Sequence, residues 1–125
     1  MACSAVLRRG GWFDPGLIDY LVQQHGMPIA DVMHMLTKRS GLLGISGISH
    51  DMRELNRAVA QNNPRAALAL SCYCYQLSKC IASYLPALQY IDCLVFTGGI
   101  GENNPGIRQE VGDLVRNQNF ASWEK

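Results

Sequence analysis

The residues with the clearest chemical potential form a glycine-rich stretch near the end of the chain. Gly98, Gly99 and Gly101 follow an apolar run over residues 91–96, and an Asn-Pro pair then begins a helical pattern. A strand, a glycine-rich turn and a helix N-terminus together bind phosphorylated ligands, because exposed N–H groups and the helix dipole favour negative charge. The alternative is a tight strand-to-helix connection without any ligand. The stretch has neither the lysine of a Walker A loop nor the dinucleotide spacing, so it predicts a different nucleotide fold.

A second polar group lies at Asp51, three residues before Glu54 and ahead of an apolar helical pattern. This spacing predicts an N-cap with a capping-box partner. Arg53 adds a cation to the same turn. On the residues alone, Asp51 serves only as a helix cap and Arg53 is a solvated charge, or both also contact a ligand.

The cysteines and histidines do not form a recognisable site. Five cysteines occur without a C-x-x-C pair, a pattern that fits neither a zinc site nor a secreted disulfide framework. They are expected to be reduced core thiols. The histidines His25, His34 and His50 are single residues far apart in the sequence, and we expect surface or packing roles for them. No metal site is predicted.

Helical patterns dominate the elements that would position these residues. Apolar spacing predicts helices over residues 17–25 and 29–36, a third from Asp51, a long one over residues 64–85, and a last one after residue 105. Residues 40–49 mix glycine and apolar residues and are expected to form an ordered loop. Pro86 should kink or end the long helix.

Two of the predicted elements are expected to be buried. The long helix is almost uncharged, and a stripe of large apolar residues marks its expected core face, formed by Leu70, Tyr73, Leu77, Ile81, Tyr84 and Leu88. Residues 91–96 form a short apolar run rich in strand formers, which predicts a strand covered on both faces. The expected fold class is therefore α/β.

Length and composition exclude several classes of protein. The 125 residues match the size of one domain, and 48% of them are hydrophobic, enough for a core. The formal charge of +1, without a basic stripe, excludes nucleic acid as an expected partner. No apolar run reaches the roughly 18 residues of a membrane helix, and the first ten residues do not resemble a secretory signal. We expect a cytoplasmic protein without a membrane partner.

Four segments together resemble the acetate and propionate kinases, members of the actin-like and sugar-kinase-like ATPase superfamily. They occur in the order and spacing of that family: residues 14–18 (DPGLI), 36–47 (LTKRSGLLGISG), 51–55 (DMREL) and 95–103 (VFTGGIGEN). The resemblance covers residues 14–111, while residues 1–13 and 112–125 match poorly. It implies an α/β fold, helix-rich with a short buried sheet, that forms part of an actin-like (ribonuclease H-like) ATPase domain.

The resemblance also implies which residues bind the nucleotide. Residues 51–53 would line the adenosine pocket, and residues 98–103 would wrap the ribose and adenine. The implied nucleotide-binding residues are Asp51, Met52, Arg53, Gly98, Gly99, Ile100, Gly101, Glu102 and Asn103. Arg9 falls where the family keeps an arginine that stabilises the phosphoryl group in transit. The residues around Arg9 depart from the family pattern, because its serine and first aspartate are missing.

The implied reaction uses ATP and acetate or propionate to form ADP and an acyl phosphate, with Mg²⁺ bridging the phosphates. The chain corresponds to part of the second half of such a kinase, within the C-terminal nucleotide-binding domain. The Mg²⁺ ligands and the acyl pocket would lie outside it, and the 125 residues alone are expected to be inactive. A homodimer is one expected assembly. The alternatives are a non-catalytic nucleotide-binding or interaction module that kept this fold, and an α/β domain without a nucleotide.

Overall fold

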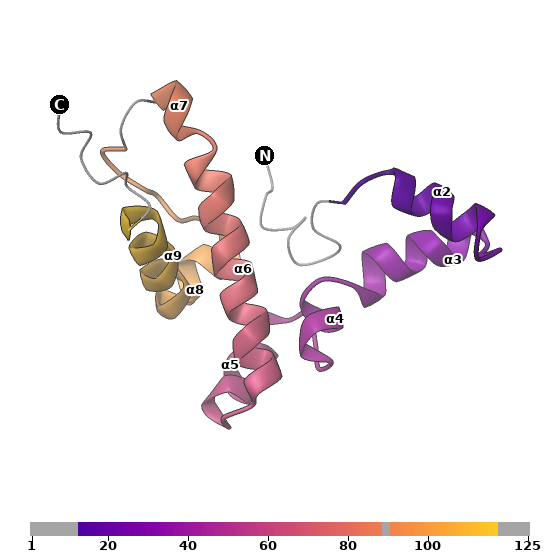
Figure 1. Ribbon diagram of the computed structural model, residues 1–125. Helices are drawn as coiled ribbons and strands as arrows, with labels where there is room; N and C mark the ends of the chain where they lie inside the picture. Colours follow the sequence, from indigo (N-terminus) through magenta and orange to yellow (C-terminus); the bar gives the residue numbers. More distant parts are fainter. Residues whose placement is uncertain (1–12, 89–90, 118–125) are drawn as a thin grey trace. The chain divides into compact units, whose positions relative to one another are not determined.

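The computed structural model describes residues 13–88 and 91–117, and helices dominate them (Figure 1). The chain divides into two compact units, residues 1–69 and residues 70–125, and the boundary falls within the longest helix. In chain order the helices are α2 (Gly16–Gln23), α3 (Ile29–His34), the π-helical turn η1 (Met35–Arg39), α4 (Leu42–Ser46), α5 (Met52–Ala60), α6 (Pro64–Ala82), α7 (Leu85–Leu88), α8 (Gly98–Asn103) and α9 (Pro105–Asn117).

In the first unit, α2 and α3 pack side by side, and α3 runs directly into η1. Both helices lie where the apolar spacing predicted them. Gly26 adopts a φ of +62° after α2, a left-handed conformation that suits glycine at a helix end. Residues 40–49 were expected to form a loop, and this prediction was wrong, because they contain α4.

Helices α5 and α6 begin at polar caps. The Oδ1 atom of Asp51 accepts a hydrogen bond from the Arg53 backbone N–H at 2.8 Å, which confirms the predicted cap. The Oδ1 atom of Asn63 accepts from the backbone N–H groups of Arg65 and Ala66, each at 3.0 Å, and starts α6 in the same way. Side-chain oxygens at these positions satisfy N–H groups that have no partner inside the helix.

Helix α6 buries a different face from the predicted one. Its buried residues are small or polar with one exception: Ala66, Ala69, Tyr73, Cys74 and Ser78. Of the predicted stripe only Tyr73 is buried, Leu77 is half-buried, and Tyr84 and Leu88 are exposed. The prediction was wrong because it followed side-chain size, whereas most of the buried positions carry small side chains. The helix ends at Ala82, before Pro86, as expected.

The predicted strand over residues 91–96 is absent, and no described residue belongs to a strand. Val95 is 75% exposed, so the expected burial on both faces is also wrong. A strand forms only where a neighbouring strand takes up its N–H and C=O groups, and the described residues offer none. The α/β assignment is therefore not supported by the described residues, which form a helical part of the fold.

In the second unit, α8 packs against α9, which buries Ile107, Val111 and Val115. Cys74, on the part of α6 that belongs to this unit, is fully buried. Burial raises the pKa of its thiol to about 12, and Glu110 on α9 adds to the effect through its charge and a hydrogen bond. Cys93 is exposed, so the expectation of core thiols is right for Cys74 and wrong for Cys93.

Candidate functional site

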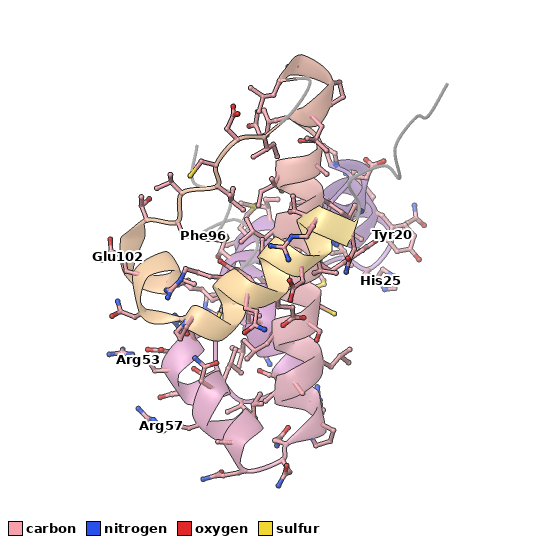
Figure 2. The ribbon with its side chains drawn as sticks, turned by 90° about the vertical axis from the view of Figure 1, so that its left-hand side faces the viewer. Tyr20, His25, Arg53, Arg57, Phe96 and Glu102 are labelled. Atoms are coloured by element: carbon pink, nitrogen blue, oxygen red, sulfur yellow. The ribbon has the colours of Figure 1, made fainter. Side chains whose placement is uncertain are left out.

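Asp51 and Arg53 form a compact charged pair at the start of α5. The Arg53 Nε atom donates to both carboxylate oxygens of Asp51, at 3.1 and 3.2 Å, and Nη2 donates to Oδ2 at 2.6 Å. The same carboxylate caps the helix, so Asp51 is both the predicted cap and the partner of the Arg53 guanidinium. The Arg53 side chain is 82% exposed, and it points outward from α5 together with Arg57 (Figure 2). This pair presents a fixed cation to solvent.

The backbone N–H of Asp51 has a partner that the sequence pattern did not indicate. It donates to the Ser49 Oγ atom at 3.0 Å. In a capping box, this N–H would instead donate to the side chain three residues later, which here is Glu54. The cap therefore consists of Asp51 and Ser49, and Ser49 was missed because it precedes the expected helix start.

The hydrogen bonds from Arg53 lower the pKa of Asp51 well below its ordinary value. Because the folded-state pKa is depressed, the stabilisation is present above the ordinary pKa of about 3.9 and is lost as the pH falls through the folded value. We therefore expect the Asp51 carboxyl, followed by NMR, to titrate with a midpoint clearly below about 3.9.

The Arg53→Gln variant provides the comparison for this titration. It removes the guanidinium and leaves the backbone N–H of residue 53 in place, so the Asp51 midpoint should move up towards its ordinary value. A midpoint that is the same in both proteins would contradict the role of the Arg53 side chain.

Met52 and Ile100 lie in the two implied binding segments but are less accessible than their neighbours. Met52 is 4% exposed and belongs to the core of the first unit. Ile100 is half-buried in α8. A nucleotide contact from Met52 would have to come from its backbone.

Residues 98–103 were expected to form a loop, and they form the short helix α8 instead. Its N-terminus is closed by Glu102, whose Oε1 atom accepts from the Gly98 N–H at 3.1 Å. At its other end, Asn103 donates to the Gly99 carbonyl and Asn104 to the Ile100 carbonyl, both at 2.9 Å. Figure 2 shows Glu102 on the outside of this segment. Glu102 and Asn103 thus stabilise the helix that carries the glycines.

Arg108 completes the C-terminal closure of α8. Its Nη1 atom donates to the carbonyl oxygens of Gly101 and Glu102, both at 2.8 Å. No motif in the sequence marks Arg108, because it lies on α9 and reaches α8 only in the folded structure.

The three glycines of α8 differ in backbone conformation and in the space around them. Gly98 has a φ of +74°, which L side chains rarely adopt. A Cβ atom at Gly101 would lie 3.2 Å from backbone and side-chain atoms of Phe96. Gly99 has neither constraint, because a Cβ there would meet nothing within 4 Å. Of the three, Gly98 alone has a positive φ.

The residues of the implied site fall in different parts of the structure. Arg9 lies outside the described residues. Asp51 and Arg53 belong to the first unit, and residues 98–103 belong to the second. Within residues 13–88 and 91–117, no three His, Cys, Asp or Glu side chains gather as a metal site would require. In the same ranges, every helix is too short or too polar to cross a bilayer.

Comparison with known proteins identifies this arrangement of segments. The family model described as "Acetokinase family" matches residues 5–120. Over 103 residues the chain is 48% identical to the acetate kinase of Thermosynechococcus vestitus, a match that covers 82% of this chain and 25% of that protein. The acetate kinase of a Geobacillus species is 45% identical over 111 residues, covering 89% and 28%.

Solved structures agree with the sequence matches. A crystal structure of Porphyromonas gingivalis acetate kinase matches with a TM-score of 0.74 and 40% identity, over 83% of this chain and 26% of that one. A propionate kinase from Francisella tularensis matches with a TM-score of 0.79 and 38% identity, over 88% and 28%. Both solved relatives are thus kinases by name. The chain belongs to the acetokinase family, which confirms the resemblance, and it spans about a quarter of the length of the curated relatives that it matches.

Proposed function

We propose that this chain carries the adenosine-binding part of an acetate or propionate kinase. The whole protein would transfer the γ-phosphoryl group of ATP to the carboxylate of acetate or propionate, giving ADP and an acyl phosphate. The observation that carries the proposal is the family match over residues 5–120, which includes both segments with implied nucleotide contacts. Adenine nucleotide, the carboxylate substrate and a second copy of the protein are the proposed partners.

The open space at Gly99 supports a ligand role for α8. Gly99 has no positive φ, and a Cβ atom there would meet no protein atom within 4 Å. A ligand could therefore approach the bare backbone closely at this position.

The fixed cation supports a ligand role for the start of α5. A guanidinium has five N–H donors, and in the described residues the Asp51 carboxylate accepts from Nε and Nη2 of Arg53. The Nη1 atom then has donors for the oxygen or nitrogen acceptors of a nucleoside. Because the ion pair already orients the planar group, less conformational freedom is lost when a ligand binds.

Magnesium would act in the whole protein by neutralising charge on the phosphates during transfer. Following the family resemblance, its ligands are proposed to lie outside this chain.

The decisive experiment is calorimetric titration of the 125-residue chain with ADP, comparing wild type with Gly99→Ala. We expect saturable binding to the wild type and at least about tenfold weaker binding to the variant, equal to about 1.4 kcal/mol. The added methyl group meets no protein atom, so the loss would come from interference with the ligand rather than from a disturbed fold.

Gly112→Ala is the matched control. Gly112 lies inside α9, and a Cβ there also meets nothing within 4 Å. This variant should bind ADP like the wild type and gain up to about 1 kcal/mol of stability from the helix-favouring residue. Equal ADP affinity of the Gly99→Ala variant and the wild type would refute the contact at Gly99, and the absence of saturable binding to the wild type would refute the proposed function of the isolated chain.

A further inference from the structure

Arg65, in the first turn of α6, bridges two segments that are twenty residues apart in the sequence. Its Nε atom donates to the Ile45 carbonyl at 3.0 Å, and Nη2 donates to the Gly44 carbonyl at 3.4 Å. Both acceptors lie in the last turn of α4, where the carbonyl groups accept no hydrogen bond from within the helix. The guanidinium therefore closes the C-terminus of α4 from outside.

Gly47 provides a second, independent mark of this contact. It follows α4 with a φ of +70°, the left-handed conformation typical of a residue just after a helix. A Cβ atom at Gly47 would lie 3.2 Å from Nη1 of Arg65 and 3.3 Å from Cζ. Glycine thus serves both the turn and the close approach of the guanidinium.

The turn after Gly47 is held by two serine hydroxyls. Ser46 is 3% exposed, and its Oγ atom donates to the Ser49 carbonyl at 3.2 Å. The same oxygen accepts from the N–H groups of Ile48 and Ser49, at 3.1 and 3.4 Å. The Ser49 hydroxyl then accepts from the Asp51 N–H. Hydrogen bonds therefore link the end of α4 to the start of α5 without a break.

We propose that Arg65 is a positioning residue for nucleotide binding, which fixes the end of α4 and, through the Ser46–Ser49 turn, holds Asp51 and Arg53 in their paired geometry. This inference rests on the proposed function for its ligand. Arg65 acts on Asp51 only through the turn, and its planar fork reaches two carbonyls at once, which a lysine ammonium on a flexible stem cannot reproduce.

The test compares Arg65→Ala and Arg65→Lys with wild type in the 125-residue chain, using two readouts. Hydrogen exchange of the Arg53 amide reports the cap, and ADP titration reports binding. We expect faster Arg53 exchange in both variants and ADP affinity lowered roughly 3- to 20-fold in Arg65→Ala, a size found for residues that act through others. The ADP affinity of Arg65→Lys should lie between that of Arg65→Ala and that of the wild type, because lysine keeps the charge and one possible contact.

Two controls separate positioning from general loss of structure. Arg57→Ala removes an exposed arginine from α5 and should leave both readouts unchanged. The amide of Val59, in the last turn of α5 and away from the cap, should keep its wild-type protection in both Arg65 variants.

Unchanged Arg53 exchange in Arg65→Ala would overturn the proposal, and so would loss of protection at Val59 and Arg53 together in both variants. If the wild type fails to bind ADP, the proposed function fails, and the exchange data alone then decide whether Arg65 holds the turn.

Discussion

Leu55→Ala is expected to destabilise the protein by about 2–5 kcal/mol, the range for truncating a buried leucine. Leu55 is fully buried and lies on the same α5 helix whose first turn carries Asp51 and Arg53. Truncation leaves a cavity and removes apolar contacts, so both the transfer and the cavity contributions apply. Urea denaturation of the wild type and the variant, followed by circular dichroism, measures the difference.

Leu68→Ala is the matched control, because Leu68 is 57% exposed on α6. It should change the free energy of unfolding by no more than about 0.5 kcal/mol, as is usual for surface positions. A cost below about 0.5 kcal/mol for Leu55→Ala would contradict the core described for the first unit.

In the second expected result, the 125-residue chain forms no acyl phosphate above background from ATP and acetate or propionate. Phosphoryl transfer is accelerated by positioning the reacting groups and by stabilising charge in the transition state. Contacts to the adenosine end bind substrate and transition state equally and lower no barrier by themselves. A coupled assay of ADP release measures turnover, first with the chain alone.

The same assay with a complementing partner distinguishes the functional readings. The partner is the remaining part of a related acetate kinase, produced separately and mixed with the chain. Turnover only in the mixture supports the proposed kinase role, whereas ADP binding without turnover in the mixture favours a non-catalytic nucleotide-binding module. Turnover by the chain alone that is lost in Arg9→Ala would contradict the expectation of an inactive chain.

The parts of the fold that the sequence predicted correctly are those fixed by local chemistry. Asp51 starts α5 because its side chain accepts from a backbone N–H two residues away, and Gly26 follows α2 with positive φ. Such features need only neighbours in the sequence. The face of α6 was mispredicted because burial is decided by what packs against the helix, and large residues such as Tyr84 are exposed while Ala66 is buried.

The candidate site divides in the same way. The motif around residues 98–103 was found by its glycines, but Arg108, which donates to the carbonyl groups at its C-terminal end, lies on another helix. Likewise α4 was taken for a loop, because its end is closed by Arg65 from twenty residues away. Gly99, Asp51 and Arg53 have polar or open surroundings that suit a ligand, and no pattern of spacing separates these from the residues that support them.

The apolar segment over residues 91–96, which forms no strand and is half-buried or exposed throughout, has a consequence for handling the protein. A short run of strand-forming residues exposed outside a sheet is a template on which further chains can add, as in the growth of amyloid. Val95, at 75% exposure, is the most exposed large hydrophobic residue of this segment. The chain should therefore form thioflavin-positive aggregates on storage at high concentration, and a charged residue at position 95 should act as a gatekeeper that suppresses them.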